Sequence, residues 1–441
     1  MKFKTFLAGC LGGLLSLNSC TNSPDMTDYA AYVNPFIGTG GHGHTFPGAI
    51  VPHGMISPSP DTRIDGWDAC SGYYYADSTI NGFSHTHLSG TGCCDYGDVL
   101  LMPTVGEQKY LPTGSQSQQM AYASAFSHQN ETAEPGYYSV FLDTYQVKAE
   151  LTASKRAAIH RYTFPESKEA GFILDLDYSL QRQTNKEMEI EVISPTEICG
   201  RKKTMYWAFD QYINFYAKFS KPFTYTLVTD SMALDDGGRL LPTCKALLHF
   251  DTTKDEQVFV KVGISAVDIE GARKNVETEI PDWDFDGIRK DARKAWNETL
   301  SKIDITTNDK DDETIFYTAL YHTAISPNLF TDVDGRYLGM DLQVHQGDTL
   351  NPLMTIIDPD LNNAFIRSLI KKHQEGGIFP MWDMASNYTG TMIGYHAVPV
   401  IVDAYMKGDR NFDIQEAYRA CVRAAEYDTT GIKCPDLVLP H

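Results

Sequence analysis

The spacing of hydrophobic residues changes near Asp268, and this change constrains the fold more than any other feature of the sequence. Before Asp268, hydrophobic residues alternate with polar ones in short runs that Gly, Pro, Asn and Asp clusters separate. A period of two residues predicts β-strands. After Asp268, hydrophobic residues recur at intervals of three and four, which predicts helices. The sequence therefore predicts a β-rich part followed by a helical part.

The strand-like runs lie between Tyr29 and Asp268. Strands at this spacing, with no long helical pattern between them, are typical of a β-sandwich. Residues 29–268 are therefore assigned to a β-sandwich domain, in which the first residues, rich in Gly and His, are expected to form extended loops. The clearest strand patterns cover residues 138–151, 157–164, 171–178, 189–200 and 258–267.

Helical spacing dominates the rest of the chain. Asp360 is expected to cap the start of one helix, and Gly376, Gly377 and Gly408 are expected to end helices. We divide this part into linker helices at residues 269–310 and a helical domain at residues 311–441. The expected helices cover residues 285–303, 312–325, 359–377, 394–408 and 413–427.

Composition excludes some classes of protein. The chain has 441 residues, which suggests two or three domains, and its hydrophobic content of 42% is sufficient for a packed core. It carries 37 basic and 57 acidic residues, a net charge of −20. Phosphate binding needs a basic surface, so no nucleic-acid partner is expected.

The first twenty residues are expected to be a sorting signal. Lys2 and Lys4 precede a run of Leu and small residues, and Leu17-Asn18-Ser19-Cys20 resembles a lipobox. This pattern predicts that Cys20 becomes the lipidated first residue of an exported protein, held in the periplasm or on the outer membrane surface. An ordinary secretory signal with cleavage nearby is the alternative. No other stretch is long enough to span a bilayer, so membrane attachment is expected only through the lipid at Cys20.

Seven cysteines follow Cys20, with irregular spacing and no Cys-x-x-Cys pair. This pattern argues against a zinc site built from cysteines. Most of these cysteines are expected to be isolated buried thiols, although one or two disulfides are compatible with an oxidising compartment.

The first cluster that could carry chemistry extends from Gly38 to Thr62. Its glycines allow a ligand to approach the backbone closely. His42, His44 and His53 could bind a metal or sugar hydroxyls, or the loop could simply pack between domains. It is not a phosphate-binding Walker loop, because no Gly-Lys-Ser/Thr follows.

The second cluster extends from Asp65 to Pro103. His85 and His87 would face the same way in an extended segment, which suits ligand hydrogen bonding better than a metal, although a purely structural loop is also possible. Trp67 followed by Asp68 could form an aromatic platform for a sugar with a hydroxyl acceptor beside it.

The third cluster covers residues 385–400 and follows Trp382 and Asp383. Its Asn, Tyr, Thr and His side chains precede a hydrophobic run, so they are expected at the N-terminus of a buried helix, where free N–H groups favour oxygen ligands. The stretch contains no carboxylate, and therefore no obvious catalytic acid.

The order of these clusters and several long blocks resemble glycoside hydrolase family 92, whose members are exported, calcium-dependent exo-α-mannosidases. The likeness extends from about Tyr32 to the end of the chain. It implies an N-terminal β-sandwich followed by part of an (α/α)6 barrel, with the active site between them. The blocks are YVNPFIGTGGHGHTFPGA, GMISPSPDT, GFSHTHLSGTG, GRYLGMD, GGIFPMWDMASN and TMIGYHAVPVIVDAYMKG.

The resemblance implies substrates that contain α-mannose, such as N-glycans or mannan, and inverting hydrolysis by a carboxylic acid and a carboxylate roughly 6.5–9.5 Å apart. Calcium is implied as cofactor, with most ligands expected outside this chain and no complete metal site within it. The residues implied to bind substrate are Gly40, Gly41, Trp67, Asp68, His87 and Asn387.

The sequence departs from the family pattern in three places. Tyr388 occupies the usual position of the acid Glu, and a phenol with a pKa of about 10 is a poor proton donor for a leaving group. A sugar-binding Trp-Asp-Thr-Phe-Arg segment expected between Gly347 and Asn351 is missing. The implied base and most calcium ligands would lie beyond His441.

These departures leave the catalytic residues unassigned and predict a truncated or split α-mannosidase with little or no activity. The first alternative is a non-catalytic, mannan-binding surface lipoprotein. The second is a structural surface protein.

Overall fold

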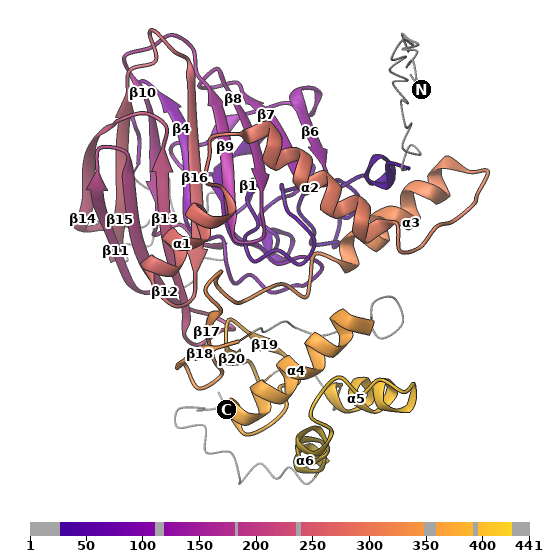
Figure 1. The fold of residues 1–441 in the computed structure, drawn as a ribbon. Helices are drawn as coiled ribbons and strands as arrows, with labels where there is room; N and C mark the ends of the chain where they lie inside the picture. Colours follow the sequence, from indigo (N-terminus) through magenta and orange to yellow (C-terminus); the bar gives the residue numbers. More distant parts are fainter. Residues whose placement is uncertain are drawn as a thin grey trace, which may run out of the picture.

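The computed structural model describes residues 27–110, 119–180, 184–234, 240–347, 359–390 and 396–425. Two antiparallel sheets fill the first part of the chain, and helices follow, as the change of hydrophobic period predicts (Figure 1). The last strand of the sandwich ends at Ser265 and the first α-helix begins at Ile269. The β-sandwich followed by helices is therefore confirmed.

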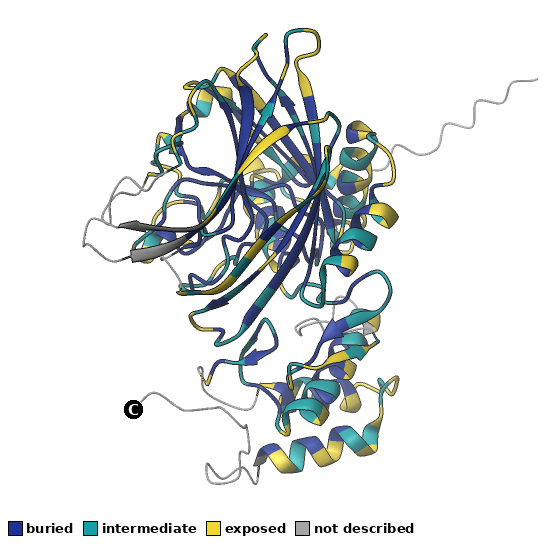
Figure 2. Ribbon diagram, turned by 90° about the vertical axis from the view of Figure 1, so that its left-hand side faces the viewer, coloured by how far each residue is buried: buried dark blue, intermediate teal, exposed yellow. Residues whose placement is uncertain are grey.

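The smaller sheet has the strand order β1-β3-β4-β10-β15-β14. Most of its described side chains are buried, because one face packs on the second sheet and loops cover much of the other (Figure 2). Its strands are β1 (Ser59–Asp61), β3 (Gly82–Ser84), β4 (Leu100–Val105), β10 (Ala170–Asp175), β14 (Thr224–Leu234) and β15 (Leu240–Phe250).

The larger sheet has the order β11-β12-β13-β16-β9-β8-β7-β6. Strand β11 lies at its edge and carries exposed Lys and Glu side chains, which disfavour pairing with another chain. Its strands are β6 (Glu131–Glu134), β7 (Tyr137–Leu142), β8 (Val147–Ala153), β9 (Ala157–Thr163), β11 (Thr184–Ser194), β12 (Glu197–Met205), β13 (Gln211–Phe219) and β16 (Gln257–Ser265).

The core between the two sheets is dominated by aromatic rings. Phe172 of β10 contacts Tyr162 of the facing sheet at a centroid separation of 4.9 Å, and Phe219 at 5.6 Å. All three side chains are almost completely buried. The inward-facing positions of the alternating runs therefore form one continuous core, which places the loops at the ends of the sandwich.

Three helices pack against the sandwich and its N-terminal loops. Each begins after an Asp that accepts a hydrogen bond from a backbone N–H in its first turn: Asp268, Asp284 and Asp309. Trp296, fully buried, donates from Nε1 to the Ile50 carbonyl at 2.6 Å and so fixes the Gly- and His-rich loop region to the helices. The helices are α1 (Ile269–Glu279), α2 (Phe285–Leu300) and α3 (Lys310–Thr323).

The remaining helices lie below the sandwich in Figure 1, with two hairpins between them and the strands. They are α4 (Pro359–Gly376), α5 (Ala397–Met406) and α6 (Ile414–Ala425), and the hairpins pair β17 (Arg336–Leu338) with β18 (Val344–Gln346) and β19 (Asp383–Met384) with β20 (Asn387–Tyr388). The short elements elsewhere are η1 (Tyr29–Tyr32), η2 (Trp67–Ala69), η3 (His128–Asn130), β2 (Thr79–Ile80) and β5 (Ser124–Ala125).

The five expected helices are present, and α1 is an additional helix. The predicted cap at Asp360 is wrong, because α4 already includes Pro359, and Asp360 lies in the first turn, where its charge still favours the helix dipole. The end of α4 agrees with the prediction: the helix ends at Gly376, and Gly377 has a φ of +80°.

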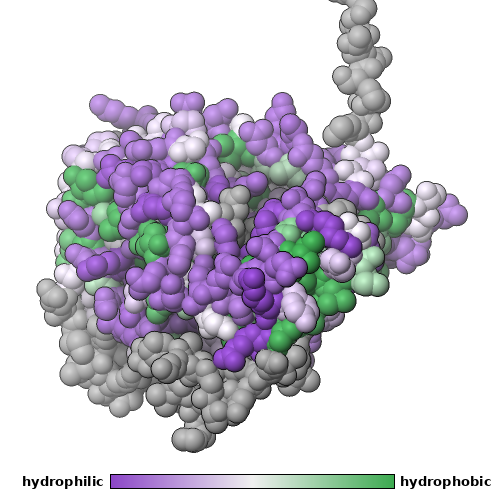
Figure 3. Space-filling model, turned by 60° about the horizontal axis from the view of Figure 1, so that its bottom comes forward, coloured by the Kyte–Doolittle hydropathy of each residue, from purple (hydrophilic) through white to green (hydrophobic). Residues whose placement is uncertain are grey.

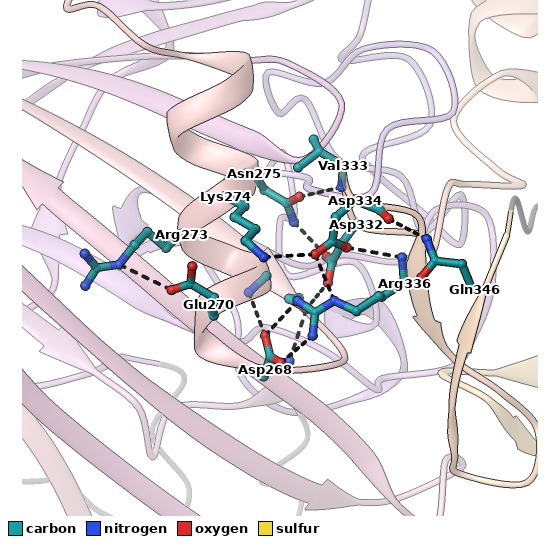
Figure 4. Close-up of polar contacts among 12 residues, drawn as sticks. Asp268, Glu270, Arg273, Lys274, Asn275, Asp332, Val333, Asp334, Arg336 and Gln346 are labelled. Atoms are coloured by element: carbon teal, nitrogen blue, oxygen red, sulfur yellow. Dashed lines mark hydrogen bonds and ion pairs between the residues drawn. The ribbon is translucent and has the colours of Figure 1, made fainter.

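A polar network joins the start of α1 to the first hairpin (Figure 4). Arg336 donates to both carboxylate oxygens of Asp268, at 2.5 and 3.1 Å, and to Asp334 at 2.8 Å. Asp332 accepts from Ser265 at 2.6 Å and from Asn275 at 2.8 Å, and burial raises its pKa. The hairpin that borders the helical part is thus held against the end of the sandwich.

Candidate active site between the sandwich and helix α4

A cavity of about 220 Å³ lies between the sandwich and the helical part. It is smaller than the roughly 300–1,000 Å³ typical of sites for drug-sized ligands, so it suits a single small molecule. The sandwich side contributes Leu88, Ser89, Thr91 and Tyr96. The residues on the other side are Ser326, Pro327, Asn328, Phe330, Tyr337, Leu338, Met340, Ser368, Lys372, Glu375 and residues 382–386. Sites between two structural parts are a common location for small-molecule binding.

The charged groups of the cavity are already bonded to protein partners. Lys372 of α4 contacts the Asp383 carboxylate at 2.7 Å, and both side chains are largely buried. Glu375 accepts from the Tyr337 hydroxyl at 2.6 Å and from the Met340 N–H at 3.1 Å. Burial and the neighbouring Glu375 raise the pKa of Tyr337, so this phenol remains a donor at neutral pH. The arrangement presents fixed donors and acceptors to a polar ligand.

Aromatic side chains continue one wall of the cavity toward solvent. The rings of Trp382 and Trp207 have centroids 6.2 Å apart, and Trp207 is 40% exposed. The backbone N–H groups of Trp207 and Ala208 donate to Asp95 at 3.3 and 2.9 Å, which fixes the loop. Burial raises the pKa of Asp95. A ligand in the cavity would therefore meet an aromatic surface on one side and charged groups on the other.

Asn387 and Tyr388 lie in a hairpin rather than at the predicted helix N-terminus, whereas His396 does directly precede a helix. Ala385 and Ser386 have φ values of 45° and 63°, which allow a tight two-residue turn between β19 and β20. Helix α5 begins only at Ala397. The Ser386 hydroxyl donates to the Leu338 carbonyl at 2.5 Å and stabilises this turn against the first hairpin.

The Asn387 side chain binds the sandwich. Its Oδ1 accepts from the Asp210 N–H at 3.0 Å, and its Nδ2 donates to the carbonyls of Asp210 and Ala385 at 2.9 and 2.8 Å. Asn387 thus orients the hairpin beside the cavity, while the residues of this hairpin that line the cavity end at Ser386. Tyr388, the residue at the expected acid position, follows Asn387 on β20 and pairs with Asp383 across the hairpin.

His87 does not line the cavity, and both of its ring nitrogens bond protein atoms. Nδ1 donates to the Ser57 carbonyl at 2.7 Å, and Nε2 lies 2.8 Å from the Asp61 carboxylate, which is also fully buried. His85 points elsewhere, with Nδ1 on the Val99 carbonyl and Nε2 facing His160. The expectation that the two imidazoles face one way is wrong, because β3 ends at Ser84 and the chain bends at the next residue.

The other predicted sugar-binding residues gather at one edge of the sandwich. Trp67 is 59% exposed, its ring meets that of His44 edge to face at 4.7 Å, and Asp68 lies 2.8 Å from His42. Gly40 and Gly41 are exposed in the same loop as the two histidines. Trp67 also packs closely on Gly92, where a Cβ would lie 1.9 Å from the ring.

Loop 88–92 connects this edge to the cavity. His44 Nδ1 lies 3.1 Å from the Thr91 carbonyl, and Thr91 itself lines the cavity. The structure thus brings Gly40, Gly41, Trp67 and Asp68 together near the cavity and places His87 and Asn387 in supporting positions. The sequence motifs did not join Trp207 with Trp382, or these with Lys372 and Glu375 of α4, into one site. These residues lie apart in the chain, and only the fold brings them together.

The residues described do not fit calcium. The group of metal-ligand side chains that they bring together is His42, His44 and Asp68, whose ligand atoms lie within 4.8 Å of one another. Calcium takes six to eight oxygen ligands, whereas this group offers two imidazoles and one carboxylate. This group of side chains therefore lacks the oxygen ligands that a calcium ion needs.

Several sequence predictions lie outside the described residues. They are the sorting signal with Cys20, the segment between Gly347 and Asn351, and Cys434. The cysteines within the described part are free thiols, all buried except the half-buried Cys421. No helix within the described ranges has the length and hydrophobicity needed to cross a lipid bilayer.

A small polar and aromatic cavity between a β-sandwich and a helical part is the candidate site for a small polar ligand. Comparison with protein families specifies the class. Residues 32–265 match the glycosyl hydrolase family 92 N-terminal domain, and residues 271–436 match the glycosyl hydrolase family 92 catalytic domain. The chain belongs to glycosyl hydrolase family 92.

Solved structures of the family agree with this assignment. A family 92 α-mannosidase from Bacteroides thetaiotaomicron is 34% identical, with a TM-score of 0.85 over 91% of this chain and 57% of that one. It has also been solved in complex with mannoimidazole, and that structure gives a TM-score of 0.84 at 34% identity, covering 91% of this chain and 56% of that one. A family 92 inverting mannosidase from the same species is 27% identical, with a TM-score of 0.78 over 93% of this chain and 57% of that one.

Among curated proteins, an uncharacterized secreted glycosidase from Arthroderma benhamiae is 27% identical over 91% of this chain and 52% of its own length. The chain therefore spans little more than half the length of the relatives it matches.

Proposed function

We propose that the protein is an exported glycosidase that releases mannose from α-mannosides such as N-glycans or mannan. The cavity between the sandwich and α4 carries this proposal, because it combines bonded charged groups with an aromatic wall. The similarity to two α-mannosidase structures, one of them solved with mannoimidazole, supports the choice of sugar. The secreted relative supports export, and lipid attachment at Cys20 remains part of the proposal.

In this proposal the terminal mannose occupies the cavity. Trp382 packs against the sugar ring, and the Lys372–Asp383 pair binds its hydroxyls. Gly40, Gly41, Trp67 and Asp68 contact the substrate from the sandwich edge. His87 and Asn387 act as positioning residues, because their polar atoms hold Asp61 and Asp210 rather than facing open space.

Hydrolysis with inversion needs one group that protonates the departing oxygen and one that activates water on the opposite face. Within the described lining of the cavity, the carboxylates are those of Glu375 and Asp383, and both already bind protein donors. Tyr388 has no carboxyl group to offer. We therefore propose weak or no hydrolysis by this chain. The calcium implied by the family resemblance has no assigned ligands among the described residues.

The second candidate is a mannan-binding surface lipoprotein without hydrolytic activity. The contacts of Glu375 and Asp383 favour it, since both carboxylates within the described lining already accept from protein donors. The binding cavity is common to the two candidates, and only product release distinguishes them.

The test is release of mannose from α-linked mannobiose and mannan, measured with and without a calcium chelator. Tyr388→Glu restores a carboxylic acid at the position where the resemblance expects it, and a working general acid is worth about 10²–10⁴-fold in rate. A rate increase in Tyr388→Glu but not in Tyr388→Phe supports the glycosidase. Mannan binding with no mannose release by the wild type or Tyr388→Glu supports the binding protein.

A further inference from the structure

His42 and His44 of one loop come together with Asp68 of the short helix η2 (Trp67–Ala69), which lies further along the chain. Their ligand atoms lie within 4.8 Å of one another. His42 and His44 lie in the loop after η1, and Asp68 lies in η2. The site lies at the edge of the sandwich, outside the cavity beside α4.

His44 is oriented as a metal ligand would be. Its Nδ1 lies 3.1 Å from the Thr91 carbonyl, and because a carbonyl only accepts, Nδ1 carries the hydrogen. The remaining nitrogen, Nε2, then presents a lone pair, and it is buried without a hydrogen-bond partner in a residue only 5% exposed. A buried acceptor without a donor costs about 1–3 kcal/mol, so an unpaired Nε2 calls for a ligand.

The surroundings of His44 match those of metal-binding histidines. Such histidines almost always donate their second ring nitrogen to a carbonyl or carboxylate, which fixes the tautomer and the ring orientation. Thr91 supplies that carbonyl, and the Trp67 ring packs against the imidazole at 4.7 Å. Only Nε2 of this ring is left without a hydrogen-bond partner, and His44 lies in the same group of ligand side chains as His42 and Asp68.

The side chains of His42 and Asp68 are more exposed than that of His44 and can shift to complete the site. Their side chains are 77% and 30% exposed and are joined by a 2.8 Å contact. Tetrahedral zinc with bonds of about 2.0–2.1 Å needs ligand atoms about 3.3 Å apart, so a shift of roughly an ångström completes the geometry. Space for it exists, since nothing lies within 4 Å of a Cβ built on Gly40 or Gly41.

We propose that His42, His44 and Asp68 form a binding site for a divalent transition-metal ion such as Zn²⁺. Two imidazoles and one carboxylate are ligands that suit zinc and its neighbours, whereas calcium and magnesium prefer an all-oxygen shell. Three protein ligands leave a fourth position open for water or a hydroxyl group. The site does not depend on hydrolytic activity or on calcium.

The test uses metal-free protein titrated with Co²⁺ and then with Zn²⁺ against a chromophoric chelator. We expect one ion per chain, with the visible absorption of four-coordinate Co²⁺ and displacement by Zn²⁺. Zinc should also raise the thermal unfolding temperature, because it binds only the folded chain. His42→Ala changes an exposed side chain and should keep the fold, yet weaken zinc binding at least about tenfold; His44→Ala and Asp68→Asn should do the same.

His345→Ala is the matched control. It removes a comparable His–Asp contact, 2.9 Å between His345 and Asp341, that has no third ligand side chain among the described residues, so zinc binding should not change. No stoichiometric metal uptake would overturn the proposal, as would unchanged affinity in a folded His42→Ala protein. An intense sulfur-to-cobalt charge-transfer band would also overturn it, because the ion would then be bound by cysteines.

Discussion

The Asn387 side chain makes two hydrogen bonds to the backbone of Asp210 and so ties the hairpin beside the cavity to the β-sandwich. Asp210 follows the aromatic loop that carries Trp207, and Asn387 follows the turn that lines the cavity. One amide group thus fixes the two walls of the candidate site relative to each other. The site depends on the contact between the two parts of the chain as much as on the residues that line it.

Asn387→Ala should lower the free energy of unfolding by about 1–3 kcal/mol, because it leaves the N–H and carbonyl of Asp210 without their partner. Urea denaturation measures the change. Asn130→Ala, at an exposed position in η3, is the matched control and should change the stability by less than about 0.5 kcal/mol. Equal effects of the two substitutions would contradict the role assigned to Asn387.

Acid should destabilise the protein through the buried His85–His160 pair. Burial lowers the pKa of His85 to about 4 and lowers that of His160 as well, from an ordinary value of 6.5. The unfolded chain therefore binds more protons than the folded chain between about pH 4 and 6.5. The free energy of unfolding should have its full value above pH 6.5. It should fall as the pH drops, by up to about 1.4 kcal/mol per pH unit for each histidine.

Urea denaturation across this pH range checks the slope. His85→Gln should flatten it, because the buried imidazole with the lowered pKa is removed. His322 and His373 have pKa values lowered by burial and act with the same sign, so some slope remains in His85→Gln. Stability independent of pH between 4 and 6.5 would show that the histidine pair is not buried as described.

Cys70 and Cys94 should form a disulfide under oxidising conditions. Their sulfur atoms lie 2.7 Å apart, although no disulfide joins them in the structure. Closing a loop of this size stabilises a protein by about 3 kcal/mol in the chain-entropy account. Oxidised glutathione should remove two titratable thiols and raise the unfolding temperature.

Peptide mapping by mass spectrometry identifies the pair. Cys94→Ser should abolish the cross-link, and Cys93→Ser should leave it intact, because the Cys93 thiol donates to Asp95 instead. The hydrogen bond between the two thiols raises the pKa of Cys94 and lowers that of Cys70, so Cys70 should react first as the thiolate, while burial raises the pKa of Cys93. A cross-link through Cys93 would contradict the geometry.

The sequence predicted the sandwich because inward-facing residues alternate regularly, and it predicted the longer helices because their hydrophobic spacing is clear. Helix α1 lies in the range 269–310 assigned to linker helices, but its own pattern was not singled out, because IEGARKNVETE offers few hydrophobic residues and buries Gly271 and Asn275 along with Ala272 and Val276. The hairpin at Asp383–Tyr388 was missed, since Ala385-Ser386 is not one of the Gly- or Asn-containing pairs that mark such turns.

The candidate site was predictable only in part. The motifs identified Trp67, Asp68, Gly40 and Gly41, and the structure gathers these residues at one edge. Sequence alone could not show that Asn387 binds the sandwich backbone, or that His44 has one bonded and one unpaired nitrogen, because their partners lie far away in the chain.

The central claim is that a terminal mannose binds in the cavity between the sandwich and α4. The most direct test is calorimetric titration of the protein with mannoimidazole, comparing the wild type with Trp382→Ala and with the control Trp283→Ala, whose tryptophan packs on Lys261 away from the cavity. We predict one binding site per chain, weakened at least about tenfold by Trp382→Ala and unchanged in Trp283→Ala. Absence of binding, or equal affinity in all three proteins, would contradict the account.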